Sequence, residues 1–218
     1  MKSLLAKSWI VTKYIAATAL LIFAVIMGIG WYVTKSRDEA IRISPFIQKL
    51  DQVEREKGNV LKLLFDGLKD IGEDDAKLVV TWLTVRQNRG EQPYLYLIGL
   101  YNGKSSDNAR KLQGIEFLAK ATLVYRVDAL KCGDPTAFQA VPILEGAMGM
   151  KTVRDSLKMN PELRKAIVAK ALEYEDQSKN RVRPEWVCAH GIKPGPPPSD
   201  ESMYIHRQSM RTEFEKSF

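Results

Sequence analysis

The chain has 218 residues, of which 45% are hydrophobic and 27% charged, and it carries a formal net charge of +7. This length leaves enough residues for one domain with a buried core. Basic residues are interspersed with acidic ones, and the densest basic stretch, Lys179 to Arg183, has no interleaved aromatic residues. The composition therefore excludes the concentrated basic face that nucleic-acid binding requires, and no nucleic-acid partner is predicted.

The first predicted element is an uncharged run over residues 14–33, YIAATALLIFAVIMGIGWYV, flanked by Lys13 and Lys35. As a helix it would be about 30 Å long, which matches the hydrocarbon thickness of a bilayer. The run predicts a transmembrane signal anchor over 14–34, preceded by a cytoplasmic tail over 1–13, with membrane lipid as a partner.

A cleaved secretory signal peptide is the alternative interpretation of the same run. The run is longer than a signal h-region, and bulky Trp31 and Tyr32 stand where a cleavage site needs small residues, so an uncleaved anchor is favoured. Within the run, Ala24 and Gly28 have the spacing of a small-residue pair that suits packing between transmembrane helices.

Cysteine usage decides the predicted orientation, because the basic residues flanking the run differ little in number. The two cysteines, Cys132 and Cys188, both follow the anchor, and an even count outside the cytoplasm predicts one disulfide. We therefore predict a single-pass protein of the cell inner membrane with a periplasmic C-terminal domain. Two unpaired cytosolic thiols are one alternative, and a zinc site with His190 and Asp134 is another; no metal ligand is predicted.

Residues 35–72 are predicted to form membrane-proximal helices. Pro45 should end or kink a helix that continues from the anchor. Apolar residues spaced by about 3.5 positions then predict two short amphipathic helices, at about 45–57 and 59–70. A coiled-coil seam that makes a homo-oligomer is the alternative, although Lys57 and Gly58 interrupt it.

Residues 73–192 are predicted to form a helical domain, because helix-capping residues punctuate them and no strand-like alternation occurs. The predicted helices begin near Asp74, Pro93, Ser105 to Asp107, Asp134 and Asn160, and the one that begins near Asp134 is kinked by Pro142. The predicted fold class is all-α, with one N-terminal transmembrane helix followed by a soluble helical bundle or a short helix-hairpin, repeat-like domain.

Two further segments complete the chain. Residues 193–198 form a predicted proline-rich linker, and residues 199–218 a C-terminal amphipathic helix or tail. The helix is interpreted as a tethered recognition helix, and a frayed or disordered tail is the alternative. Large side chains on helix faces are the predicted protein-binding residues, because such side chains dominate interfaces. They are Tyr94, Tyr96, Tyr101, Tyr125, Met203, Met210 and Phe214.

The segment 93–124 resembles one Sel1-like or tetratricopeptide-like repeat. The matching residues are Tyr96-Leu97-Ile98-Gly99-Leu100-Tyr101, the loop Asn102-Gly103-Lys104, and Ala109, Phe117 and Lys120-Ala121. The resemblance implies close helix packing at Gly99, Ala109 and Ala121, and a scaffold that presents a concave surface to peptides or proteins. An ordinary helical bundle with one such helix pair is the alternative.

Motifs of catalysis are missing from the sequence: it has no phosphate-binding glycine loop, nucleophile elbow or H-E-x-x-H, and only two histidines. No catalytic residue and no cofactor is predicted, and the chain is not expected to be an enzyme. The predicted function is a single-pass membrane-anchored helical scaffold or accessory subunit of a bacterial envelope complex, such as secretion, conjugation or cell-wall machinery, that recognises other membrane or envelope proteins. The alternative is a small accessory subunit of a membrane enzyme or transporter, held through its transmembrane helix.

Overall fold

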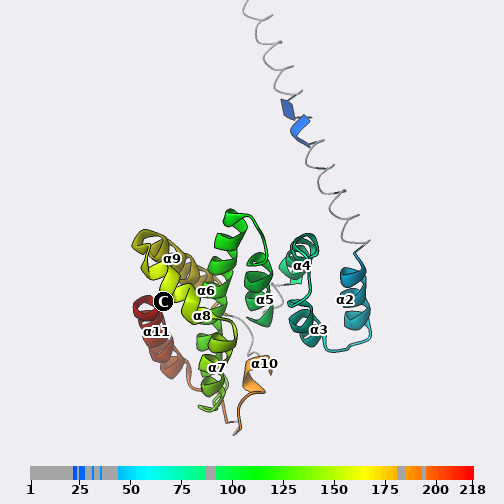
Figure 1. Ribbon diagram of the computed structural model, residues 1–218. Coiled ribbons are helices and arrows are strands. Elements are labelled where there is room, and N and C mark those ends of the chain that lie inside the picture. The colour runs from blue at the N-terminus through cyan, green and yellow to red at the C-terminus, as the bar shows by residue number, and fades with distance from the viewer. Residues whose placement is uncertain are drawn as a thin grey trace, which may run out of the picture. The chain divides into compact units, whose positions relative to one another are not determined.

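The computed structural model describes residues 22, 23, 25–27, 31, 35, 44–86, 92–180, 185–192 and 195–218. The chain divides into two compact units, residues 1–48 and 49–218. All regular elements of the described residues are helices, which confirms the all-α class (Figure 1). They are α2 (Pro45–Arg55), α3 (Val60–Gly67), α4 (Glu73–Arg86), α5 (Gln92–Asn102), α6 (Asn108–Leu130), η2 (Ala137–Gln139), α7 (Ala140–Ala147), α8 (Met150–Lys158), α9 (Pro161–Gln177), α10 (Glu185–Cys188) and α11 (Asp200–Ser217).

The transmembrane part of the predicted fold class is corrected. In the described part of the chain, no helix is both long enough and apolar enough to cross a bilayer. The longest helices there, α6 with 23 residues and α11 with 18, carry charged side chains along their length, whereas a span needs about 20 mostly apolar residues. Most of the run 14–34, including Ala24 and Gly28, lies outside the described residues.

The centre of the second unit is the hairpin of α5 and α6. Asp107 caps α6 by accepting a hydrogen bond from the backbone N–H of Ala109. The two helices approach closely at glycines, since a Cβ atom added to Gly99 would lie 2.6 Å from Leu118 Cγ, and one added to Gly114 would lie 2.8 Å from the Gly99 carbonyl oxygen. The close packing expected at Gly99 is therefore present, while Ala109 is exposed and Gly114 provides the small residue of α6.

We expect Gly99→Ala to lower the free energy of unfolding by about 1–3 kcal/mol, because the added methyl group would overlap Leu118 across the hairpin. Gly146→Ala in α7 is the matched control. No atom lies within 4 Å of its added Cβ, so alanine should instead stabilise the helix by up to about 1 kcal/mol. Urea unfolding measures the free energy of unfolding of both variants. An equal change in the two would show that the close approach of α5 and α6 at Gly99 does not affect stability.

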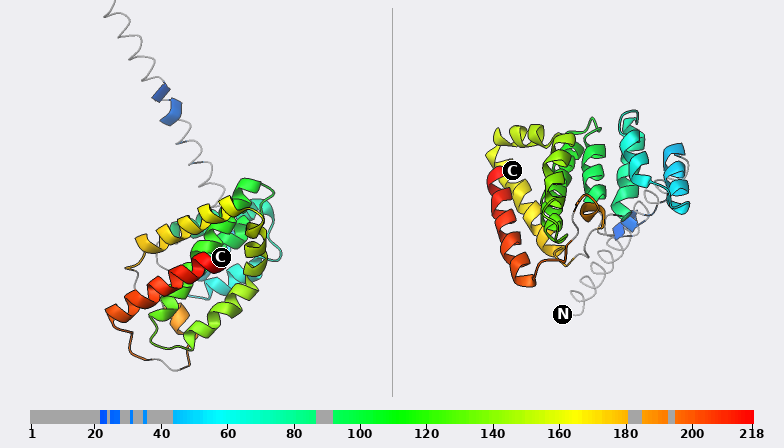
Figure 2. Two further views of the ribbon diagram at one scale, coloured as in Figure 1. Left: turned by 90° about the vertical axis from the view of Figure 1, so that its left-hand side faces the viewer. Right: turned by 90° about the horizontal axis from the view of Figure 1, so that it is seen from below.

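Further helices extend the hairpin on both sides. α4 packs against α5, and α9 and α11 pack against α6, so α5 and α6 lie between two helical layers (Figure 2). Trp82 of α4 donates a hydrogen bond to Asp51, and the guanidinium of Arg86 lies 3.6 Å from the centre of the Trp82 ring. These contacts hold α4 to the part of α2 that belongs to this unit.

Candidate functional site

An open, largely apolar groove of about 520 Å³ lies in the second unit. We call it the α3–α5–α7 groove after the helices whose C-terminal ends form it. Its lining residues are Phe65, Leu68, Lys69, Leu100, Lys104, Leu144, Ala147 and Met148. A groove of this volume falls in the size range of ligand-binding sites.

The floor of the groove is continuous with the hydrophobic core. Phe65, Leu100 and Leu144 are half-buried and pack against the core cluster, and Met148 is buried with 8% of its surface exposed. The three walls come from α3, α5 and α7, which are tens of residues apart in the sequence. They meet only because the helices pack into one domain. Because its floor is supported by the core, the groove is a stable feature of the fold.

The rim of the groove carries two exposed lysines, Lys69 and Lys104. Lys69 follows the end of α3 and Lys104 follows the end of α5, where a cation complements the partial negative charge of a helix C-terminus. No carboxylate of the described residues lies within ion-pair distance of either ammonium group. The rim is therefore positively charged beside an apolar floor.

The four predicted binding tyrosines lie in the core instead of on a surface. Tyr94, Tyr96, Tyr101 and Tyr125 each expose at most 6% of their surface. The hydroxyl of Tyr101 donates a 2.6 Å hydrogen bond to the Leu64 carbonyl, and the rings of Tyr96 and Tyr125 meet edge to face at 6.2 Å. Burial raises the pKa of Tyr125 to about 12 and also raises the pKa of Tyr96 and Tyr101. These residues stabilise the domain and offer almost no exposed area to a partner.

The C-terminal helix α11 docks on its own domain. Met203 and Met210 are half-buried, and Phe214 is fully buried and stacks on Phe218 with ring centres 4.8 Å apart. Ser199 caps the helix, since its hydroxyl accepts a hydrogen bond from the Ser202 N–H. The inner face of α11 thus completes the core, and it is not available for recognition in this arrangement.

Two arginines of α11 hold it to a buried carboxylate of α9. Glu175 is completely buried and receives hydrogen bonds from Arg207 at 2.8 Å and from Arg211. Arg207 also contacts Asp176 at 2.9 Å, and its guanidinium lowers the pKa of that carboxyl. This ion-pair cluster is the polar part of the α9–α11 contact.

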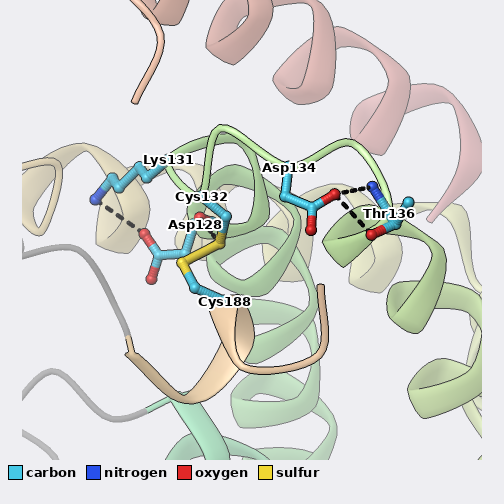
Figure 3. Close-up of a disulfide and its surroundings, with 6 residues drawn as sticks. All are labelled: Asp128, Lys131, Cys132, Asp134, Thr136 and Cys188. Atoms are coloured by element: carbon cyan, nitrogen blue, oxygen red, sulfur yellow. Dashed lines mark hydrogen bonds and ion pairs between the residues drawn. A yellow bond between two sulfur atoms is a disulfide. The ribbon is translucent and has the colours of Figure 1, made fainter. Parts of the chain in front are cut away.

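The predicted disulfide is present, and it joins Cys132 at the end of α6 to Cys188 of α10 (Figure 3). Both sulfur atoms take part in this bond, so neither is a thiolate that could bind zinc at the alternative site with His190 and Asp134. Beside it, Lys131 pairs with the buried Asp128 at 2.9 Å. Asp134 accepts hydrogen bonds from the N–H and the hydroxyl of Thr136, which fixes the turn that follows Cys132.

The proline-rich segment crosses this turn in tight contact. Gly133 has φ 66°, and an added Cβ there would lie 2.0 Å from the Pro196 carbonyl oxygen. In return, a Cβ on Gly195 would lie 2.5 Å from the Gly133 carbonyl oxygen. The described end of the predicted linker is therefore packed against the domain. A smaller cavity of about 320 Å³ beside it is lined by residues that include Asp134, Phe138 and His206.

Within the part of the chain that the structure describes, no three or more His, Cys, Asp or Glu side chains form a group suited to a metal ion. The groove was not predicted from the sequence. Its only sequence signal is an apolar residue followed closely by a lysine at two helix ends, Leu68-Lys69 and Leu100 with Lys104, and this pattern is common in surface helices.

Comparisons with protein-family models, with curated proteins and with solved structures find no match to this chain. The Sel1-like resemblance of residues 93–124 stays a prediction, because the α5–α6 hairpin neither confirms it nor rules it out.

Proposed function

We propose that the chain is a non-catalytic helical scaffold or accessory subunit that binds another protein in the α3–α5–α7 groove. The observation that carries the proposal is the groove itself, an open and largely apolar surface supported by the core. Most of the floor side chains are only half-buried, and clefts of this size that are lined mainly by apolar side chains are typical of binding sites.

The disulfide supports a place outside the cytoplasm. Disulfides persist in oxidising compartments such as the periplasm and are rare in the reducing cytosol. We therefore propose that the domain works in the cell envelope, as part of an assembly such as secretion, conjugation or cell-wall machinery. In such an assembly a partner would gain affinity mainly from apolar side chains placed on the floor of the groove.

Site-specific photo-cross-linking in cells tests the proposal. A photoreactive amino acid in place of Ala147, which lines the groove, should yield a discrete adduct, while the same group at exposed Ala166 of α9 should not. Leu68→Asn removes apolar surface from the groove without changing its charge, and it should reduce the Ala147 adduct about tenfold. Equal adducts at the two positions, or an adduct that survives Leu68→Asn in a folded protein, would refute the groove as the binding site.

A further inference from the structure

We infer that the occupant of the α3–α5–α7 groove is an amphipathic helix of a partner protein that carries carboxylates beside its apolar face. This inference rests on the function proposed above and names the chemistry of the partner. Its basis is the combination of an aliphatic floor with two rim lysines, which together match a ligand that is apolar on one side and acidic at the edge.

Charge complementarity selects the acidic edge. Many lysines of this unit already contact a carboxylate, as Lys62 contacts Asp66 and Lys170 contacts Glu116, whereas Lys69 and Lys104 contact none among the described residues. Two acidic side chains close in sequence to the groove walls are themselves paired, and Asp70, which follows Lys69, lies beyond ion-pair distance of the Lys69 ammonium group. Asp66 contacts Lys62, and Glu145 contacts both Arg126 and Arg154. The rim thus offers two cations that a bound carboxylate would neutralise.

The shape and chemistry of the floor favour a helix over other ligands. The described residues present no strand edge to which an extended peptide could add, and the floor has one aromatic ring, Phe65, where proline-rich ligands need several. Leucines and Met148 instead form the flexible aliphatic surface typical of grooves that accept the i, i+3, i+4 and i+7 side chains of a helix. The groove is open to solvent, unlike the enclosed cavities that hold acyl chains.

A displayed peptide library tests the inference on the full chain. The library holds helical peptides with leucine at i, i+3, i+4 and i+7 and with flanking positions randomised among Glu, Lys and Gln. Peptides are selected on the wild-type chain after counter-selection on Leu68→Asn, so that only groove-dependent binders remain. The selected peptides should be enriched in flanking Glu and should bind about tenfold tighter than the same peptides with Lys at those positions.

Charge reversal provides the decisive variant. Lys69→Glu combined with Lys104→Glu should invert the preference and select Lys-flanked peptides. The matched control, Lys111→Glu with Lys165→Glu, reverses two exposed lysines outside the groove and should keep the preference for Glu.

The outcomes separate the inference from the proposed function. Groove-dependent binders without a charge preference, or a preference that Lys69→Glu and Lys104→Glu leave unchanged, would overturn the acidic partner but retain a protein-binding groove. A library without any groove-dependent binder would overturn both. Groove-dependent binding of a fluorescent fatty acid, with no peptide selected, would likewise overturn both in favour of a lipid ligand.

Discussion

Replacing Cys132 and Cys188 together by alanine should lower the free energy of unfolding by about 4 kcal/mol. The two residues are 56 positions apart, and the chain-entropy model assigns a closed loop of this size about 4 kcal/mol of restriction on the unfolded chain. In the native protein the same bond fixes α10 to the end of α6. Urea unfolding without reductant, monitored by circular dichroism, measures the change.

Wild-type protein unfolded in excess reductant is the matched control, and its midpoint should fall to that of the alanine variant. A double variant as stable as the oxidised wild type would show that the disulfide adds nothing to the fold. The same cysteines report the compartment in intact cells. Labelling by a membrane-impermeant maleimide only after reduction would place the domain outside the cytoplasm, and labelling without reductant only in permeabilised cells would contradict that placement.

Glu175→Ala should destabilise the protein by about 3–5 kcal/mol and release α11 from α9. The substitution leaves the guanidinium groups of Arg207 and Arg211, which are only 15% and 20% exposed, without the buried carboxylate that compensates them. Hydrogen exchange should then show amide protection lost over residues 200–218, well before the α5–α6 hairpin opens.

Asp176→Asn is the control for this prediction. Asp176 contacts the same Arg207 but is 53% exposed, so solvent screens the pair and its loss should cost much less stability than the loss of Glu175. If the two variants lost equal stability, burial of Glu175 would not be the source of the effect. If Glu175→Ala left the exchange of α11 unchanged, the two aromatic residues Phe214 and Phe218 would be sufficient to hold the helix.

Local signals predicted the helices well because the residues concerned act on their own backbone. Asn160 caps α9 through the Leu163 N–H, with Pro161 in its first turn, and Asp107 and Ser199 do the same for α6 and α11. The sequence of α5 is apolar on all sides, which is typical of a buried helix, and Tyr94 to Ile98 are buried. The one helix expected after Asp134 is instead η2, α7 and α8, since Gly149 has φ 66° and interrupts the helix.

Long-range placement is what the sequence left open. An aromatic side chain has the same pattern whether it fills a core or an interface, so the tyrosines were assigned to recognition although tertiary packing buries them. The α3–α5–α7 groove depends on three helix ends that are distant in sequence, and no local pattern indicates that they meet. The transmembrane helix was predicted from the composition of one apolar run alone. The described helices contain no such span, and most of the run lies outside the described residues.

The disulfide also closes a covalent ring. Residues 132–188 form that ring, and it contains α7, α8 and α9 together with the exposed connection at Met159, which is 86% accessible. A protease that cuts at Met159 would therefore produce a nicked chain whose two pieces stay joined as one molecule. One wall of the groove, from α7, belongs to the ring, while α3 and α5 precede it. All three walls precede Met159 and would stay on the N-terminal piece, so the effect of the disulfide would be to keep α9 and α11 attached to that piece.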